Sequence, residues 1–304
     1  MIISQVKKRT AKFVFDRYFA RHLNGLLAPQ IPIALDYAVE AKPRYGYGKQ
    51  PHRLLYDLLD ANKARYRAIL QDVASEVGLF RAIAADPASD TGPDFANPFF
   101  SGLDAFALCE MLRRRDPRLY IELGSGNSTK FARRTIRDYG LRTRIISLDP
   151  APRAEINEIC DEIIRQPSEA VDSELWDQIA ADDILFVDGS HRVFMNSDVT
   201  NVFLEVLPRL KTGTLVHFHD ILLPYDYPPQ WADRWYSEQY LLACQLLGGA
   251  RLRVVLPNAF VSREAELTQI LDGIWLYPEM RTVHAHTLAL YHGYLGYSFW
   301  AEIV

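Results

Sequence analysis

The sequence predicts an α/β protein with a mostly parallel sheet, helices on both faces of that sheet, and a helical segment before it. Short and almost wholly apolar runs recur from residue 98 onward and alternate with helical patterns, which is typical of strands buried on both faces. Residues 54–77 instead carry apolar side chains at helical spacing. The last two strand-like runs suit an antiparallel hairpin at the end of the sheet.

The predicted elements follow one another in a regular order. Helices are expected at residues 104–114, 130–139 and 196–210. Strands are expected at residues 120–123, 144–148, 162–165, 183–187, 213–219, 251–256 and 297–304. Residues 262–295 then form a long excursion between the last two strands.

Two parts of the chain are predicted, an N-terminal helical extension over residues 1–95 and an α/β domain over residues 96–304. The boundary follows residues 86–98, which are rich in Pro, Asp, Gly and Asn as linkers are. Residues 7–22 are basic with aromatic residues interleaved, and a helix packed on its own domain or on a partner subunit explains them better than a membrane surface does. The extension is expected to cover the functional site or to join two copies in a homo-oligomer.

Composition limits the partners and the compartment. The chain has 304 residues, 49% of them hydrophobic, and a formal net charge of −4, so it can bury a sizeable core and has no general attraction for nucleic acid. Cys109, Cys160 and Cys244 are scattered and odd in number, which favours a reducing compartment. No apolar run is long enough to span a bilayer and no signal peptide is recognised, so a cytoplasmic location is expected.

The most informative run is residues 120–129, Tyr-Ile-Glu-Leu-Gly-Ser-Gly-Asn-Ser-Thr. A short apolar strand leads into an acid, a tight glycine turn follows, and a helix begins directly after it. Glycines let the backbone approach a ligand closely, and the free N–H groups of the helix start face that ligand. The pattern predicts a cradle for a small charged ligand, built from Glu122, Gly124, Ser125, Gly126, Asn127 and Ser128.

Two cofactors compete for this cradle. The NAD fingerprint requires Gly or Ala where Thr129 stands, and Glu122 would repel a pyrophosphate. S-adenosylmethionine (SAM) fits better, because its ammonium and sulfonium groups attract an acid and its carboxylate accepts hydrogen bonds from the helix start.

Acids and histidines follow the other strands in the same way. Ligands of open α/β sheets bind beyond the carboxyl ends of the strands. Each of these strand ends carries an acid or a histidine. A loop without a function needs polar residues there but not acids at every strand end. The residues are Glu122, Asp149, Asp188 with His191, and His219 with Asp220.

These motifs resemble those of class I SAM-dependent methyltransferases. The resemblance rests on residues 122–129, on Ile-Ile-Ser-Leu-Asp at 145–149, on Phe-Val-Asp-Gly-Ser-His at 186–191 and on Leu-Val-His-Phe-His-Asp at 215–220. The last two runs are similar to those of a general small-molecule methyltransferase family. The resemblance covers about residues 98–304 and implies a Rossmann-like seven-stranded sheet, mostly parallel with a terminal antiparallel hairpin.

The resemblance also implies how the cofactor is held. Gly124, Ser125 and Gly126 would wrap its methionine part, with Asn127, Ser128 and Asp188 close by. Glu122 would lie near its amino group. Asp149 would accept hydrogen bonds from both ribose hydroxyls, although an Asp before Pro150 is also a common turn residue.

Methyl transfer to a hydroxyl requires that a proton be removed, and two devices could do this. The fourth and fifth strands are expected to be neighbours, so Asp188, His219 and Asp220 would converge and could hold Mg²⁺ or another divalent cation. Alternatively, His191 would act as a general base whose pKa is tuned by Asp188 or Asp198, unless it only caps the following helix. His217, which shares a face with His219, is expected to be a core residue.

The loop after Asp220 is rich in prolines and aromatic residues and is expected to line the acceptor pocket. Its candidates are Tyr225, Tyr227 and Trp231, with packing on the domain as the alternative for Trp231, and Glu238 and Tyr240 follow on a helix that reaches the site. We therefore predict a methyltransferase that acts on a small-molecule hydroxyl. The alternatives are a catalytically silent SAM-binding or scaffold protein and an NAD-dependent oxidoreductase, while a nucleic-acid methyltransferase is set aside because residues 188–191 do not read Asn/Asp-Pro-Pro-Tyr.

Overall fold

The computed structural model describes residues 39–86 and 89–304, so the prediction for residues 7–22 lies outside the described part. Residues 42–304 form one compact unit. The described helices between residues 53 and 85 belong to this same unit. The predicted boundary between an extension over residues 1–95 and a catalytic domain over residues 96–304 stays a prediction. It concerns which residues the activity needs.

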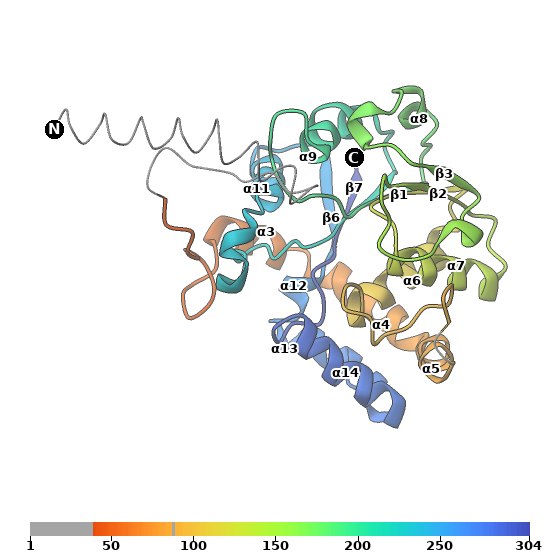
Figure 1. The fold of residues 1–304 in the computed structure, drawn as a ribbon. Coiled ribbons are helices and arrows are strands. Elements are labelled where there is room, and N and C mark those ends of the chain that lie inside the picture. The colour runs from red at the N-terminus through yellow and green to blue at the C-terminus, as the bar shows by residue number, and fades with distance from the viewer. Residues whose placement is uncertain (1–38, 87–88) are drawn as a thin grey trace, which may run out of the picture. The chain divides into compact units, whose positions relative to one another are not determined.

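The sheet has seven strands in the order β3-β2-β1-β4-β5-β7-β6 (Figure 1). β1 to β5 pair in parallel, and β7 runs antiparallel to both β5 and β6, which confirms the predicted Rossmann-like sheet with a terminal antiparallel hairpin. The strands are β1 (Leu119–Leu123), β2 (Arg144–Leu148), β3 (Glu162–Ile164), β4 (Ile184–Val187), β5 (Leu215–Phe218), β6 (Leu252–Pro257) and β7 (Phe299–Ile303).

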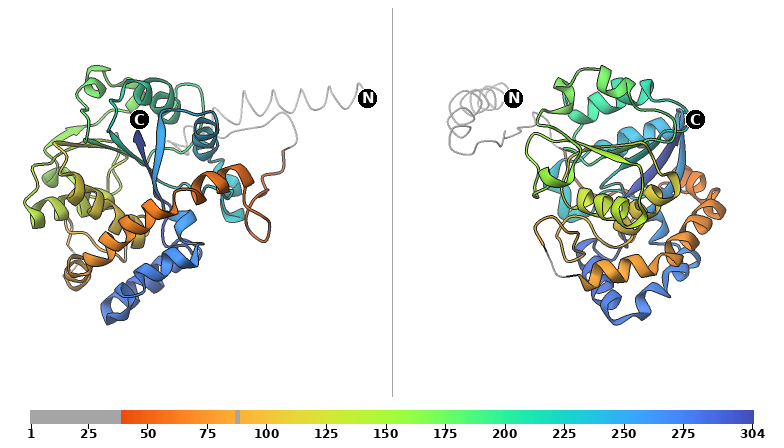
Figure 2. Two further views of the ribbon diagram at one scale, coloured as in Figure 1. Left: turned by 180° about the vertical axis from the view of Figure 1, so that it is seen from behind. Right: turned by 90° about the vertical axis from the view of Figure 1, so that its right-hand side faces the viewer.

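The helices lie on both faces of the sheet, with α4, α6, α7 and α14 on one face and α8 to α10 on the other (Figures 1 and 2). A central parallel sheet requires such cover because its strands are apolar on both faces. The principal helices are α3 (Arg53–Asp60), α4 (Lys63–Ser75), α5 (Val77–Ala85), α6 (Gly102–Arg115), α7 (Asn127–Tyr139), α8 (Glu174–Asp177), α11 (Glu238–Leu247), α12 (Asn258–Val261), α13 (Ala265–Thr268) and α14 (Pro278–Leu290).

The helix expected at residues 196–210 is not one regular α-helix. It consists of α9 (Asp198–Asn201), a π-helical turn η4 (Val202–Val206) and α10 (Leu207–Arg209). Pro208 lacks a backbone N–H and so cannot donate within this run, which is one reason for irregular hydrogen bonding there.

The register of the central strands aligns their carboxyl ends. Leu123 of β1 is paired with Leu148 of β2 and with Val187 of β4, and Val187 is paired with Phe218 of β5. The residues that follow each strand therefore meet at one edge of the sheet, which places the predicted site residues side by side.

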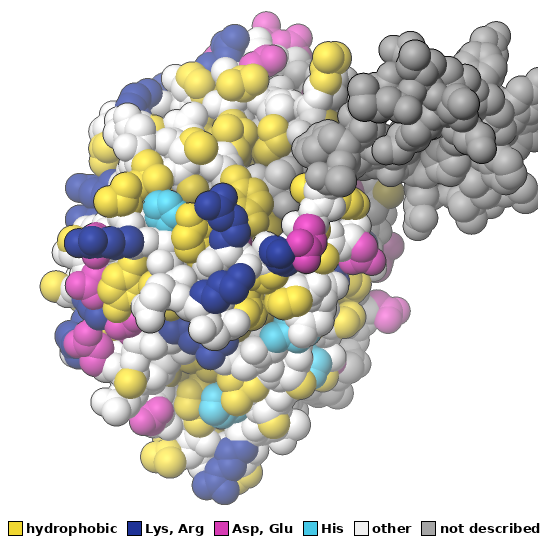
Figure 3. Space-filling model, turned by 90° about the vertical axis from the view of Figure 1, so that its left-hand side faces the viewer, with side chains coloured by type: hydrophobic (Ala, Val, Ile, Leu, Met, Phe, Trp, Pro, Cys, Tyr) yellow, Lys and Arg dark blue, Asp and Glu magenta, His cyan; other side chains and the backbone are white. Residues whose placement is uncertain are grey.

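Charged side chains of both signs are mixed with hydrophobic ones on the face shown in Figure 3. That mixture differs from the single-sign field that steers a protein toward a polyanion. In the described part of the chain, no helix has the length and apolar character needed to cross a bilayer.

A candidate active site at the carboxyl edge of the sheet

The glycine turn after β1 is locked between its neighbouring strands. Gly124 has a φ of +79°, and a Cβ added to it would lie 1.8 Å from the carbonyl oxygen of Asp188. The N–H of Gly124 donates to Leu148 in β2, and the N–H of Asp188 donates to Leu123. Only glycine fits this position, because both its backbone conformation and its surroundings exclude a side chain.

Glu122 is fully buried beneath the start of α7. Its carboxylate accepts hydrogen bonds from the Tyr120 hydroxyl, at 3.1 Å, and from the Thr129 hydroxyl. The Thr129 oxygen in turn accepts from the N–H of Gly126, at 2.9 Å. Thr129, the residue that disfavours NAD, thus ties the glycine turn to the acid.

Burial raises the pKa of Glu122 to about 7, although hydrogen bonds from Ser128, Thr129 and Tyr120 oppose part of this rise. A carboxyl group that is costly to ionise when alone is well suited to a cation that neutralises it. The site therefore has the chemistry expected for binding an ammonium group.

Asp149 follows β2 and joins the same loop. Its Oδ2 accepts from the Ser125 N–H at 2.8 Å, and its Oδ1 accepts from the Ala151 N–H at 2.7 Å. The second contact is the turn interaction expected of an Asp before Pro150, and each oxygen retains a lone pair for a further donor. The structure thus brings all the predicted cradle residues together, with Ser125 and Ser128 buried and Asn127 half-buried at the start of α7.

His191 lies among three carboxylates. Its Nδ1 is 2.9 Å from Glu238 Oε2, and its Nε2 is 3.2 Å from Asp188 Oδ1 and 3.5 Å from Asp220 Oδ2. Burial alone would lower the pKa of this imidazole, but Asp188, Glu238 and Asp220 outweigh burial and raise the pKa well above 6.5. These carboxylates therefore favour the imidazolium form of His191.

His219 faces the same two aspartates from β5. Its Nδ1 is 3.5 Å from Asp188 and 3.6 Å from Asp220, and its Nε2 is 3.2 Å from Asp104 Oδ2. The pKa of His219 is raised well above its ordinary value by these acids despite burial. The two imidazoles in turn hold the pKa of Asp188 far below its ordinary range, against the opposing effect of burial.

Asp104 is a site residue that the sequence did not reveal. It lies in the first turn of α6, is fully buried, and receives four hydrogen bonds. Besides His219, the donors are the Asn258 amide at 2.8 Å and the N–H groups of Tyr297 and Ser298 at 2.9 and 2.8 Å. The only available signal was an acid within an otherwise apolar helical pattern.

Glu238 reaches the site as expected, whereas Tyr240 donates to Asp226. The second oxygen of Glu238, Oε1, has no hydrogen-bond partner among the described residues. The suggestion that Asp198 tunes His191 is not supported, because Asp198 accepts from the N–H and hydroxyl of Ser190 instead.

His217 is a core residue, as expected. It is fully buried, stacks on Phe186 at a ring-centroid distance of 3.7 Å, and contacts Ser298 through Nε2 at 2.7 Å. Burial and the neighbouring His219 lower the pKa of His217 well below 6.5, so it stays neutral.

The predicted metal site is not supported by the donor arrangement. In residues 39–86 and 89–304, no group of three or more His, Cys, Asp or Glu side chains is arranged to hold a metal ion. Asp188 and Asp220 instead lie between two imidazoles, which supply the positive charge that a cation would otherwise provide.

The aromatic loop after Asp220 packs into a cluster next to His191. Tyr227 is buried and its oxygen accepts from the Gln239 N–H at 3.2 Å, while Trp231 is buried with the Arg234 guanidinium 4.3 Å from its ring. Tyr236, not predicted, connects this cluster to the site through ring contacts with Tyr227 at 5.7 Å and with His191 at 4.6 Å.

Tyr225 is half-buried at the edge of this cluster, and a chain segment from before α3 covers the loop there. The N–H of Tyr45 donates to Asp226 at 3.0 Å, and the N–H of His52 donates to the Pro224 carbonyl. Trp231 is packed on the domain, which is the alternative that the sequence left open for this residue.

Part of this chain is similar to a described protein family. A family model described as a methyltransferase domain matches residues 121–221. Similar solved structures include the SAH-bound methyltransferase PaMTH1 of Podospora anserina, with 18% identity, 65% of this chain and 89% of that chain covered, and a TM-score of 0.39.

Another is the plantazolicin methyltransferase BamL in complex with a triazolic desmethylPZN analog and SAH, with 11% identity, 82% and 99% covered, and a TM-score of 0.41. No curated protein sequence matches significantly. The family match extends from β1 to just past the end of β5, the strands whose ends form the cradle and the His191 cluster. Residues 121–221 of this chain are therefore similar to a methyltransferase domain, which agrees with the resemblance seen in the sequence motifs.

Proposed function

We propose that this protein transfers the methyl group of SAM to a hydroxyl oxygen of a small-molecule acceptor. The observation that carries the proposal is the meeting, at one edge of the sheet, of the glycine cradle and the carboxylate–imidazole cluster. The two share Asp188, whose backbone closes on Gly124 while its side chain contacts both histidines.

The cradle has the groups that SAM requires. The start of α7 offers N–H donors to a carboxylate, the buried Glu122 suits an ammonium group, and Asp149 has lone pairs available for ribose hydroxyls. When bound, SAM supplies a methyl group on a sulfonium. The obligatory Gly124 leaves that part of the loop free of side-chain bulk.

The cluster supplies a base for the acceptor. Glu238 contacts Nδ1 of His191 and so holds the orientation of the imidazole ring. Nε2 then faces Asp188 and Asp220, as in a general base that is oriented by a carboxylate. With SAM bound, the acceptor oxygen would receive the methyl group and SAH would be left, while Nε2 of His191 would take the hydroxyl proton. Because the carboxylates favour the imidazolium form, His191 would first have to release a proton. The aromatic cluster around Tyr227 and Tyr236 excludes water beside this step.

A catalytically silent SAM-binding protein is the second candidate, since the cradle alone accounts for cofactor binding. The buried charge cluster favours the enzyme. Burying two imidazoles and several carboxylates is costly, and a scaffold has no need of them.

The first test is calorimetric titration of the protein with S-adenosylhomocysteine (SAH), with NAD as the parallel ligand. We expect saturable binding of SAH alone. Asp149→Ala should weaken SAH at least about tenfold through the lost hydrogen bonds to ribose, whereas Asp172→Ala, in an exposed loop, should not. Binding of NAD alone would refute the cofactor assignment.

The enzymatic part is tested separately with radiolabelled SAM and a panel of small phenols, alcohols, amines and thiols. Methylation of hydroxyl compounds that is lost in His191→Gln would support the proposal. Tight SAH binding without transfer to any acceptor would favour the silent protein, and transfer to amines alone would contradict the oxygen acceptor.

A further inference from the structure

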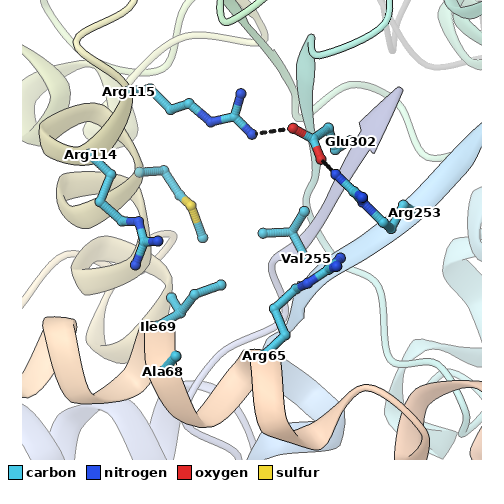
Figure 4. A pocket seen from close by; sticks show the side chains of 9 residues that line it. Arg65, Ala68, Ile69, Arg114, Arg115, Arg253, Val255 and Glu302 are labelled. Carbon is cyan, nitrogen blue, oxygen red and sulfur yellow. Dashed lines mark hydrogen bonds and ion pairs between the residues drawn. The ribbon is translucent and has the colours of Figure 1, made fainter. Parts of the chain in front are cut away.

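A cavity of about 230 Å³ lies between α4, α6, β6 and β7, outside the site described above (Figure 4). Four arginines surround it, Arg65 from α4, Arg114 and Arg115 from the end of α6, and Arg253 from β6. Ile69, Met111 and Val255 give it an apolar floor, and Glu302 of β7 is its one acidic lining residue.

The cavity lies at the edge of the sheet opposite the cofactor cradle. Arg115 donates to the Gly213 carbonyl at 2.9 Å, just before β5 begins, and Arg253 is the second residue of β6. These are the amino ends of β5 and β6, whereas the cradle follows the carboxyl ends of β1 and β2, which are parallel to β5. A ligand here would not overlap the cofactor.

Among the described residues that line the cavity, four are arginines and one is an acid. Arg115 and Arg253 share Glu302, with Arg115 Nη2 2.6 Å from Glu302 Oε1 (Figure 4). Arg114 pairs with Asp72, a half-exposed side chain whose charge water screens, and lies 4.0 Å from Glu110. Arg115 also pairs with the exposed Asp182 at 3.1 Å. Arg65 donates to the Val254 carbonyl at 3.2 Å, and within the described part of the chain it makes no ion pair.

This arrangement selects the chemistry of a ligand. Guanidinium groups are planar and bind carboxylate or phosphate oxygens in pairs. The apolar floor would cover one side of a hydrocarbon body, and the volume is below the usual range for ligand pockets, which suits about one ring with its head group. We propose that this cavity binds a small amphipathic anion, an aryl or short alkyl compound that ends in a phosphate or a carboxylate, with Arg65 as a principal contact.

The test is calorimetric titration with phenyl phosphate and with benzoate, and with phenol and inorganic phosphate as the separate halves of the ligand. We expect one of the two anions to bind saturably and more tightly than either half. Arg65→Gln should weaken it at least about tenfold. Arg67→Gln is the matched control, because Arg67 is on the same helix and pairs with Glu266 outside the cavity.

The outcomes separate this site from the cofactor cradle. Binding that Arg65→Gln weakens and SAH does not displace supports the site, and the preferred anion tells whether the head group is a phosphate or a carboxylate. Equal weakening by Arg65→Gln and Arg67→Gln, displacement by SAH, or no saturable binding of either anion would overturn the proposal.

Discussion

Gly124 allows three strands to converge on one turn, and it is the residue at which the smallest change should have a large effect. Gly124→Ala places a methyl group 1.8 Å from the Asp188 carbonyl oxygen, in a backbone conformation that disfavours side chains. β1 and β4 would have to separate, so we expect a loss of about 3 kcal/mol or more of unfolding free energy in urea denaturation. Gly78→Ala, with open space around the position, should change stability by less than about 1 kcal/mol.

Glu122 is a buried carboxyl group whose ionisation destabilises the ligand-free fold. Its folded-state pKa of about 7 exceeds its ordinary 4.5, so ionisation of Glu122 costs the ligand-free fold free energy as pH rises between these values. The groups that face this carboxyl are Tyr120, Ser128, Thr129 and, through its charge, Asp188. At pH 8 we therefore expect Glu122→Gln to stabilise the ligand-free protein, by up to about 3 kcal/mol, and to weaken SAH binding.

Thermal unfolding of both proteins at pH 5 and pH 8 checks this prediction. The stabilisation should be larger at pH 8, because at pH 5 Glu122 is already mostly protonated in the fold. Glu162→Gln, at an exposed position in β3, serves as the control. If Glu122→Gln changed the unfolding temperature by the same amount at both pH values, the raised pKa of Glu122 would be contradicted.

At the scale of elements, Asp104 joins α6 to the two strands that border the site. One carboxylate holds His219 after β5, the chain entering β7, and Asn258 at the start of α12. Asp104→Asn would turn an N–H₂ group toward existing donors, so we expect a loss of about 2–4 kcal/mol in chemical denaturation. Asp57→Asn on the exposed face of α3 should be nearly neutral, and a similar small effect for Asp104→Asn would refute its role as an anchor.

The elements that the sequence predicts well are those whose signal is local. Apolar runs identified the seven strands, and the Gly-Ser-Gly turn after an acid identified the cradle. Asp104 and His219 are 115 positions apart in sequence, so nothing local announces their contact. The burial of Trp231 likewise depends on Tyr297, which lies just before β7 and more than 60 residues later in the chain. Nothing local announces the π-helical turn η4 either.

At the scale of the whole molecule, α6 extends between the two proposed binding sites. Its first turn holds Asp104 beside the His191 cluster, and its last turn carries Arg114 and Arg115 in the arginine cavity. Fourteen residues of α-helix extend about 20 Å, which is the approximate distance between the two ends of α6. The two sites lie at opposite edges of the same sheet. This separation allows each site to be altered without direct contact with the other.

The pH dependence of methyl transfer should report the charge of the whole His191 cluster. Three carboxylates, Asp188, Asp220 and Glu238, face this imidazole, and Tyr236 packs on its ring. Because they raise the pKa of His191 well above 6.5, they disfavour its neutral form at the pH at which an ordinary histidine loses its proton. We expect kcat/KM to rise with pH through an inflection above 6.5 if His191 is the base.

Glu238→Gln tests this expectation without removing the imidazole. Loss of the carboxylate 2.9 Å from Nδ1 removes one cause of the raised pKa, so the inflection should move to lower pH. The maximal rate should also fall, because Gln orients the ring less strongly. Glu174→Gln on the exposed start of α8 should leave the profile unchanged. An inflection that Glu238→Gln does not move would assign the proton transfer to another group, and Asp220, 3.5 Å from Nε2, would then be the next carboxylate to replace.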